Sequence, residues 1–297
     1  MTKSKKIEIN LGSVQKTLFL PLIARALESK KTKPMLIDMT AIEIVERVDY
    51  DFSKLISSTA ELSRIGWIVR CTCFDRLIKD FIKRYPKATI VNIGCGLDTT
   101  YERVNNGSIL WYDLDLPDVI ELRKLFMHET LNRKFISGSF MENNWYKYLY
   151  RPEHILFIAE GVYYYYEQKV IRAFFIKLTL MFPACELLFD VTSPAGVRAT
   201  NRELRKTVMN NESLLKWGLK NTETILSWNP RLRLLGKYYT YKQEGVVLNL
   251  KNRILGWISD ALDIQYIVHL KINFDYKRMN HVQSRNMFRL LNNLINN

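Results

Sequence analysis

The chain has 297 residues, 47% of them hydrophobic and 25% charged, a balance that excludes disordered, collagen-like and disulfide-rich proteins and is typical of a globular protein with a sizeable core. Lysine and arginine outnumber aspartate and glutamate by 44 to 30, which gives a formal net charge of +14. Because the basic residues are spread along the whole chain and form no block, we favour a basic solvated surface over a nucleic-acid footprint.

The cysteines and the N-terminus bear on metals and membranes. The four cysteines lie at positions 71, 73, 95 and 185, with neither CxxC spacing nor a histidine at zinc-ligand spacing. We therefore predict no metal site and a reduced, cytoplasmic protein. The basic N-terminus is not followed by an unbroken apolar run, because Pro21 and Arg25 interrupt it. We accordingly predict no signal peptide, no membrane-spanning segment and no membrane partner.

Helical periodicity dominates residues 1–85. Apolar residues recur every three or four positions over residues 14–28, 40–47 and 67–84, the spacing that places them on one face of a helix. This part of the chain is predicted to be an N-terminal helical region.

The pattern changes after Pro86, which ends the third predicted helix. Five short apolar runs follow, each of the kind that a buried parallel strand requires. Helical segments at 118–128 and 167–181 lie between them. The runs cover residues 88–93, 108–112, 154–159, 185–191 and 266–273. Strands that alternate with helices indicate an α/β fold with a doubly wound parallel sheet, whose core we place at 86–193 and 227–275.

One segment departs from this alternation. Residues 200–226 are polar, charged and helical in pattern. Within the larger stretch 194–226 we predict a cap inserted above the carboxyl ends of the strands, with a simple surface crossover as the alternative. Residues 276–297 form a basic, Asn-rich tail. The whole chain is predicted to be a single domain.

The strongest local motif is the run VNIGCGLDTT, which begins at Val91. A strand ends in Gly94 and Gly96 and a helix then begins, so that backbone amides can approach a nucleotide-like ligand closely. The third glycine of the dinucleotide fingerprint is replaced by Thr99. This change disfavours the pyrophosphate of NAD or FAD and favours a ligand without phosphate, of which S-adenosylmethionine is the common one.

Two acids follow the glycines at about the spacing expected for a ribose ligand. Asp113 and Asp115 lie in the next predicted strand, roughly 20 residues downstream. A carboxylate at the tip of that strand would accept hydrogen bonds from ribose hydroxyls. The alternative, for one of the two, is an N-cap of the helix that starts at Pro117.

Four segments together resemble the leucine carboxyl methyltransferase family. They are GWIVR from Gly66, VNIGCGLDTT, WYDLDLPDVIELRK from Trp111 and LFIAEGVYYYY from Leu156. That family includes methyltransferases of protein C-terminal carboxylates, of a tRNA-borne wyosine precursor and of bacterial polyketide acids. The segments TLFLPLIARALESKK and AIEIVERVDYDF look most like its bacterial branch named for tetracenomycin polyketide synthesis. The resemblance covers roughly residues 12–275 and implies a Rossmann-like class I methyltransferase fold with a mostly parallel seven-stranded sheet.

The resemblance also implies a binding site for S-adenosylmethionine. It assigns the methionine carboxylate to Arg70, the ribose to Asp115 in preference to Asp113, and a further cofactor contact to Glu160. Where the family usually has an acid that contacts the adenine edge, this chain has Ser139, so the contact falls to that hydroxyl or to main chain. The predicted cofactor residues are Arg70, Gly94, Gly96, Asp98, Asp115, Leu116, Ser139, Phe140 and Glu160.

The methyl acceptor is less constrained. Tyr165 matches a tyrosine often present in the family and is predicted to orient the acceptor, while the basic cap residues Arg198, Arg202 and Arg205 are predicted to bind it. An ionised carboxylate acceptor needs no general base, and no histidine lies in a motif linked to the pocket, so we favour a small-molecule carboxylate over a hydroxyl. The alternatives are a tRNA or protein-carboxyl methyltransferase and an inactive S-adenosylmethionine-binding module.

Overall fold

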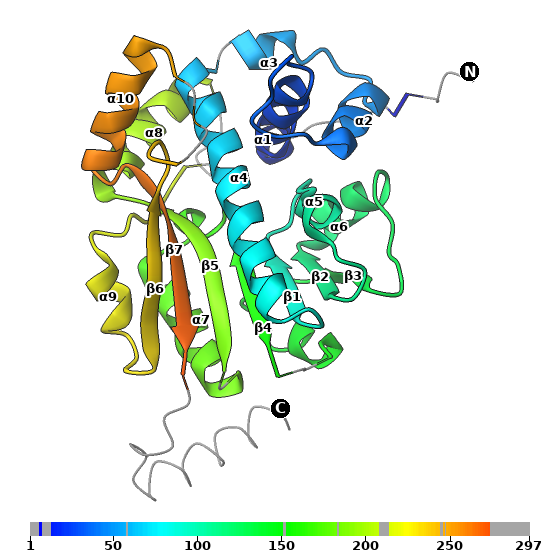
Figure 1. Cartoon of the computed structure of the whole chain (residues 1–297), viewed down its shortest axis with the longest axis vertical. Coiled ribbons are helices and arrows are strands. Elements are labelled where there is room, and N and C mark those ends of the chain that lie inside the picture. Colours follow the sequence, from blue (N-terminus) through cyan, green and yellow to red (C-terminus); the bar gives the residue numbers. More distant parts are fainter. Residues whose placement is uncertain are drawn as a thin grey trace, which may run out of the picture.

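A computed structural model describes residues 6–7, 13–57, 59–150, 153–182, 184–207, 214–243, 246 and 248–273. Its centre is a seven-stranded sheet in the order β3-β2-β1-β4-β5-β7-β6 (Figure 1). β7 pairs antiparallel with both β5 and β6, and the pairings among β3, β2, β1, β4 and β5 are parallel. The strands span Thr89–Ile93 (β1), Leu110–Asp115 (β2), Arg133–Ser137 (β3), Ile155–Ala159 (β4), Cys185–Thr192 (β5), Leu232–Tyr239 (β6) and Gln265–Ile272 (β7). The predicted mostly parallel seven-stranded sheet is confirmed.

The sheet is buried on both faces, which explains why its central strands read as apolar runs. In β1, Val91 and Ile93 belong to the hydrophobic cluster that includes helix α7 (Gln168–Met181). Ile90, on the opposite face, belongs to the cluster that includes α4 (Glu61–Arg84), which crosses the sheet in Figure 1. All five residues of β1 are buried. Burial on both faces thus positions the carboxyl ends of these strands rigidly.

Two strands and several short helices were not predicted. β3 and β6 lie at the two edges of the sheet and alternate or lose burial along their length, so neither presents an apolar run in the sequence. The helices α3 (Ser53–Ser57) and α5 (Thr100–Val104) are too short to show apolar periodicity, and α10 (Leu250–Ala261), whose apolar residues are largely exposed, was not predicted either. The predicted helix at 118–128 is α6, Pro117–Lys124.

The N-terminal helices were predicted well and pack against the glycine-loop side of the sheet. They are α1 (Ser13–Ser29), α2 (Met39–Arg47) and α4. Phe19 and Ile44 share a hydrophobic cluster with Leu97, Leu122 and Phe126 of the sheet region. The N-terminal helices thus share a hydrophobic core with the sheet region, and the division into one domain stays a prediction.

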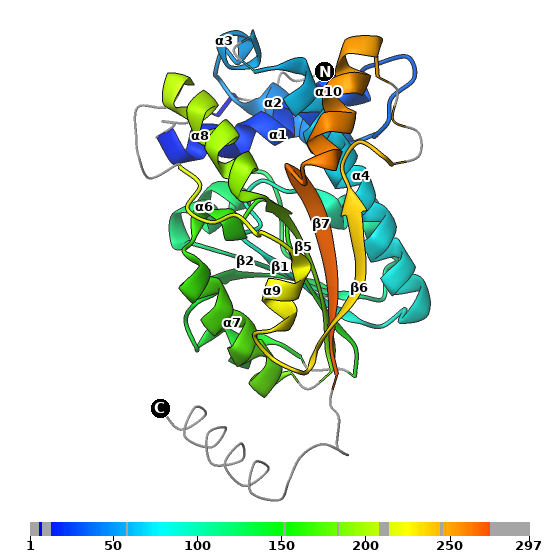
Figure 2. The ribbon, with the colours of Figure 1, turned by 90° about the vertical axis from the view of Figure 1, so that its left-hand side faces the viewer.

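The predicted cap differs in detail from expectation. Helix is present at α8 (Pro194–Thr207) and α9 (Thr222–Leu226), but residues 214–221 between them are not helical. The backbone N–H groups of Lys216 and Leu219 donate instead to the carbonyls of Tyr164 (2.7 Å) and Thr192 (2.8 Å). Figure 2 shows α8 at the same end of the molecule as α1 and α10. The predicted tail at 276–297 lies outside the described residues.

Candidate active site

The glycine loop after β1 is the first wall of the candidate site. Gly94 and Gly96 have φ angles of +63° and +45°, which L side chains rarely adopt. A Cβ on Gly94 would lie 2.6 Å from Cγ2 of Val162, so the loop passes close to the turn after β4. The N–H of Gly96 donates to Oδ2 of Asp115 at 2.7 Å. The loop and the tip of β2 are thus joined directly.

Asp115 is half-buried at the carboxyl end of β2. Its other oxygen, Oδ1, accepts the N–H of Leu116 at 2.8 Å. Burial raises the pKa of Asp115 above its ordinary value, against the opposing effect of the two backbone hydrogen bonds. The side chain of Leu116 is 44% exposed beside it. Each carboxylate oxygen can therefore accept a further hydrogen bond at the carboxyl end of β2, as binding of the two ribose hydroxyls requires.

Asp113 has a different environment, because it is fully buried. It accepts hydrogen bonds from Arg123 (3.0 Å), Arg133 (2.8 Å), Asn92 (3.2 Å) and the indole of Trp111 (2.9 Å). Four donors leave no room for a ligand. The helix after β2 has no side-chain cap, so the alternative that one of these aspartates is its N-cap is wrong.

Arg70 is the charged centre of the second wall. It projects from α4, and only 5% of its side chain is exposed. Its Nε donates to Oε1 of Glu160 and its Nη1 donates to Oδ2 of Asp190, both at 2.9 Å. Burial lowers the pKa of Arg70, but the carboxylates of Asp190 and Glu160 more than offset this and hold it well above the ordinary value. Its Nη2 makes no hydrogen bond to any described residue, which leaves two N–H donors for an anion.

Glu160 follows β4 and is 12% exposed. Its Oε1 also accepts from the thiol of Cys71 at 3.1 Å, whereas Oε2 has no partner within the described part of the chain. Burial raises the pKa of Glu160, with Arg70 opposing. Beside Arg70, Glu160 thus offers an acceptor next to a donor, a pair suited to the ammonium and carboxylate of an amino acid.

Asp190 is a site residue that the sequence reasoning missed. It lies near the end of β5, is fully buried, and accepts from the N–H of Gly161 (2.6 Å) and the amide of Gln265 (3.0 Å) as well as from Arg70. A signal was present in the sequence, since Asp190 is an acid within the apolar run at 185–191. Its partner Arg70 stands 120 positions away, which only the fold reveals.

Of the four tyrosines after Gly161, two pack in the core and two lie near Arg70. Tyr163 is fully buried, and Tyr166 packs edge-on against Phe140. The hydroxyl oxygen of Tyr164 accepts a hydrogen bond from Nη1 of Arg70 at 3.5 Å. Tyr165 packs against the ring of Tyr164 and its hydroxyl has no hydrogen-bond partner among the described residues. Burial raises the pKa of Tyr165, so its phenol remains protonated and is a donor.

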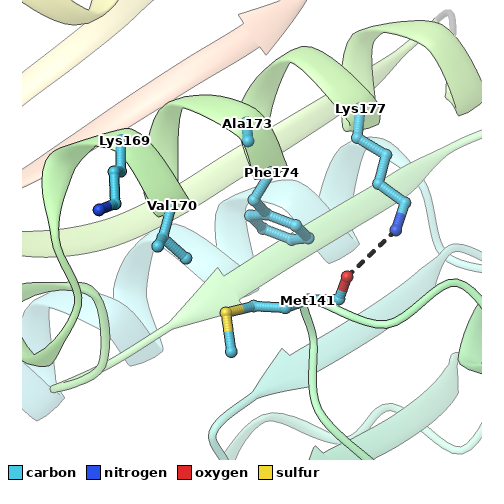
Figure 3. A pocket seen from close by; sticks show the side chains of 6 residues that line it. All are labelled: Met141, Lys169, Val170, Ala173, Phe174 and Lys177. Atoms are coloured by element: carbon cyan, nitrogen blue, oxygen red, sulfur yellow. Dashed lines mark hydrogen bonds between the residues drawn. The ribbon is translucent and has the colours of Figure 1, made fainter.

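The predicted adenine side is built by the loop after β3. Ser139 is half-buried and its Oγ accepts the N–H of Met141 at 3.3 Å, while the ring of Phe140 lies in the core. Behind this loop Lys177 donates to the carbonyl of Met141 (Figure 3). The groove drawn there has a volume of 310 Å³ and is lined by Met141, Lys169, Val170, Ala173, Phe174 and Lys177. Phe140 packs against Phe174, which lines this groove.

Asp98 contributes to the shape of the loop. Its carboxylate accepts from Asn92 (2.9 Å) and from the N–H and hydroxyl of Thr100 (3.1 and 2.8 Å). Burial raises its pKa, but the charges of nearby arginines, Arg103 first, outweigh burial and lower it. The structure therefore places Asp98 as a support of the glycine loop.

The cap arginines lie on helix α8, which follows β5. Arg198, Arg202 and Arg205 are exposed on α8, whereas Asn201 fastens the helix to the backbone of Leu215 at 2.8 and 2.9 Å. Their predicted contact with the acceptor stays a prediction.

Comparisons with known proteins give the family of the chain. The sequence model of the family described as leucine carboxyl methyltransferase matches residues 19–179. The tetracenomycin polyketide synthesis O-methyltransferase TcmP of Streptomyces glaucescens is 30% identical over 228 residues, which cover 76% of this chain and 82% of that protein. The S-adenosyl-L-methionine-dependent methyltransferase dpfgK of Gibberella zeae is 23% identical, with 86% and 91% covered.

A solved structure supports the fold. The crystal structure of a DUF574 family protein from Streptomyces avermitilis superposes with a TM-score of 0.54 at 12% identity, covering 85% of this chain and 96% of that one. The solved structure shows only the fold, whereas the family match and the relative at 30% identity show the family. The chain belongs to the leucine carboxyl methyltransferase family, and it is an S-adenosylmethionine-dependent methyltransferase.

Proposed function

We propose that S-adenosylmethionine lies along the carboxyl ends of β2, β1 and β4, and that the methyl group passes to an oxygen of a small molecule. The donor set fits the cofactor at both ends. Asp115 would accept the ribose hydroxyls, and the open Nη2 of Arg70 and Oε2 of Glu160 would hold the methionine carboxylate and ammonium. The bound cofactor supplies a methyl group on a cationic sulfur, which an aligned oxygen nucleophile displaces in line.

The residues around the candidate site favour a carboxylate as the acceptor. Burial raises the pKa values of Tyr164 and Tyr165, which keeps both phenols protonated at neutral pH. Of the three described histidines, His128 is exposed after α6, His154 precedes β4 and stacks on Tyr85, and His269 in the middle of β7 is buried and pairs with Glu186. A carboxylate is ionised without a base, whereas a hydroxyl must lose its proton. Tyr165 would then orient the acceptor by donating a hydrogen bond.

One observation carries this proposal. Asp115 retains acceptor capacity at one strand end, and Arg70 and Glu160 each retain an atom without a described hydrogen-bond partner near another. The similarity to TcmP, whose name gives it as an O-methyltransferase of polyketide synthesis, adds support for a small-molecule acceptor. All four cysteines are free and buried, in keeping with the predicted cytoplasmic location.

The test is transfer of tritiated methyl groups from S-adenosylmethionine into a cell extract separated into small-molecule, protein and RNA fractions. We expect label in the small-molecule fraction, released as methanol by mild alkali because methyl esters are base-labile and methyl ethers are not. Alkali-stable label there would change the acceptor to a hydroxyl. Label in RNA, with binding that weakens steeply as salt rises, would assign the +14 charge to tRNA and overturn the proposal.

A further inference from the structure

Helix α10 (Leu250–Ala261) packs with its polar side inward. Asn252 and Asp260 are 5% and 1% exposed. The amide of Asn252 donates to Glu61 at 2.8 Å, and both oxygens of Asp260 accept the N–H of Tyr241 at 3.0 and 3.1 Å. Gly256, between them on the same face, is so close to the Tyr241 ring that a Cβ would lie 2.9 Å from Cγ. The orientation of α10 is therefore fixed by specific contacts.

The consequence is an outward face made of large apolar side chains. Leu250, Ile254 and Trp257 are 65%, 53% and 64% exposed, and Ile258 is 41% exposed. Their spacing, at the first, fifth, eighth and ninth positions of the helix, places them in one stripe. We call these four residues the α10 stripe. A contiguous stripe of this kind on a helix whose polar face is satisfied indicates a docking surface.

Charge selects the partner of the α10 stripe. Lys251 and Arg253 are both exposed on α10, and Asp260, the acid of this helix, is buried. The chain as a whole carries +14. A second copy would bring the same cations to the contact, and like charges repel there. Tryptophan and aliphatic side chains bordered by basic residues are instead the composition of helices that lie in the interface of an anionic bilayer.

We infer that the α10 stripe binds peripherally to membranes that contain anionic lipids, with Lys251 and Arg253 contacting the headgroups. No described helix is long and apolar enough to cross a membrane, and such attachment needs none. The inference revises the sequence-based prediction of no membrane partner. In Figures 1 and 2, α10 lies at the same end of the molecule as α8 and α1.

The test is co-sedimentation of the full chain with vesicles of phosphatidylcholine alone or mixed with phosphatidylglycerol. We expect binding to the mixed vesicles that weakens as salt rises. The double variant Ile254→Glu, Trp257→Glu should lower the affinity at least about tenfold, because two apolar side chains lose their burial in the lipid. The matched control is Leu131→Glu, which places an acid at a side chain that is 94% exposed just before β3, and it should bind as the wild type does.

A second pair of variants separates charge from folding. Lys251→Glu with Arg253→Glu leaves the α10 stripe intact, and we expect it to weaken binding to the mixed vesicles about tenfold or more. Thermal melting should be unchanged in both double variants, since all four side chains are exposed. Wild-type protein that binds neither vesicle, or variants that bind as well as wild type, would overturn the inference. A dimer in analytical ultracentrifugation that Ile254→Glu, Trp257→Glu dissociates would assign the stripe to a second copy.

Discussion

Asp113 and Asp115 stand two positions apart on β2 and on the same face of the strand, yet their surroundings differ completely. Asp113 is fully buried and neutralised by Arg123 and Arg133. Among the described residues, the hydrogen-bond donors to Asp115 are the backbone N–H groups of Gly96 and Leu116. A buried acid within a strand requires charged partners, whereas an acid at the carboxyl end of a strand can be held by backbone N–H groups and remain accessible to a ligand.

The largest effect should follow from breaking the inner acid. Asp113→Asn leaves two buried guanidinium groups without their carboxylate, and we expect a loss of about 3–5 kcal/mol in the free energy of unfolding. Urea denaturation measures it. Asp118→Asn, at an exposed position in the first turn of α6, is the matched control and should cost less than about 1 kcal/mol. Equal losses in the two variants would contradict the structural role of Asp113.

Changing the edge acid should affect binding more than stability. Asp115→Asn removes the charge and retains an oxygen for the N–H of Gly96, but it removes the acceptor of the N–H of Leu116. Because Leu116 is exposed, the unfolding free energy should fall by no more than about 1 kcal/mol. Affinity for S-adenosylmethionine should fall about 10–100-fold, the equivalent of roughly 1.5–3 kcal/mol for hydrogen bonds to a charged group. Calorimetry should show the same fall for methylthioadenosine, which has the ribose but lacks the amino-acid group. Unchanged titrations would remove Asp115 from the cofactor site.

Arg70→Lys tests the other end of the proposed cofactor. A lysine keeps the charge but cannot reach Glu160, Asp190 and a ligand carboxylate together, since it lacks the planar fork. We expect the affinity for S-adenosylmethionine to fall about tenfold while that for methylthioadenosine is unchanged. If the affinities for both ligands fell equally, the substitution would disturb the whole candidate site, and Arg70 would not be a specific ligand of the methionine carboxylate.

The sequence predicted the parts of the site that are local in the chain. The glycine loop and Glu160 each follow an apolar run, and two acids follow the run at 108–112, so these strand ends were visible without a structure. The preference for Asp115 over Asp113 came from the family resemblance. Asp190 was missed because its role depends on Arg70 in α4 and on Gln265 in β7. Contacts between elements that are distant in sequence are not encoded in local periodicity.

The fold shows the same division. Central strands buried on both faces were predicted, whereas the edge strands β3 and β6 were not, since their side chains partly face solvent. In the cap, polar composition predicted helix at residues 214–221, but backbone hydrogen bonds to Tyr164 and Thr192 hold this segment in a non-helical path. Tertiary partners outweighed local propensity there.

The smallest effect is a pair of pH dependences of opposite sign. Glu186 lies near the start of β5, at the end of the sheet opposite the candidate site. Burial alone would raise its pKa, but hydrogen bonds from His269 and Arg84 outweigh burial, and the pKa is lowered. The stability that Glu186 contributes is therefore present above its unfolded pKa of about 4.3 and is lost as pH falls through the lower folded value. Glu186→Gln should accordingly be most destabilising near neutral pH.

Asp115 should behave in the reverse way. Its folded pKa is raised by burial, so the wild type loses stability as pH rises from the unfolded pKa of about 3.9 through the folded value. Relative to the wild type, Asp115→Asn should therefore gain stability with rising pH, while Glu186→Gln loses it. Urea denaturation of the three proteins between mild acid and neutral pH gives both slopes. Slopes of the same sign would contradict the distinction between an acid held by cations and an acid held by backbone amides.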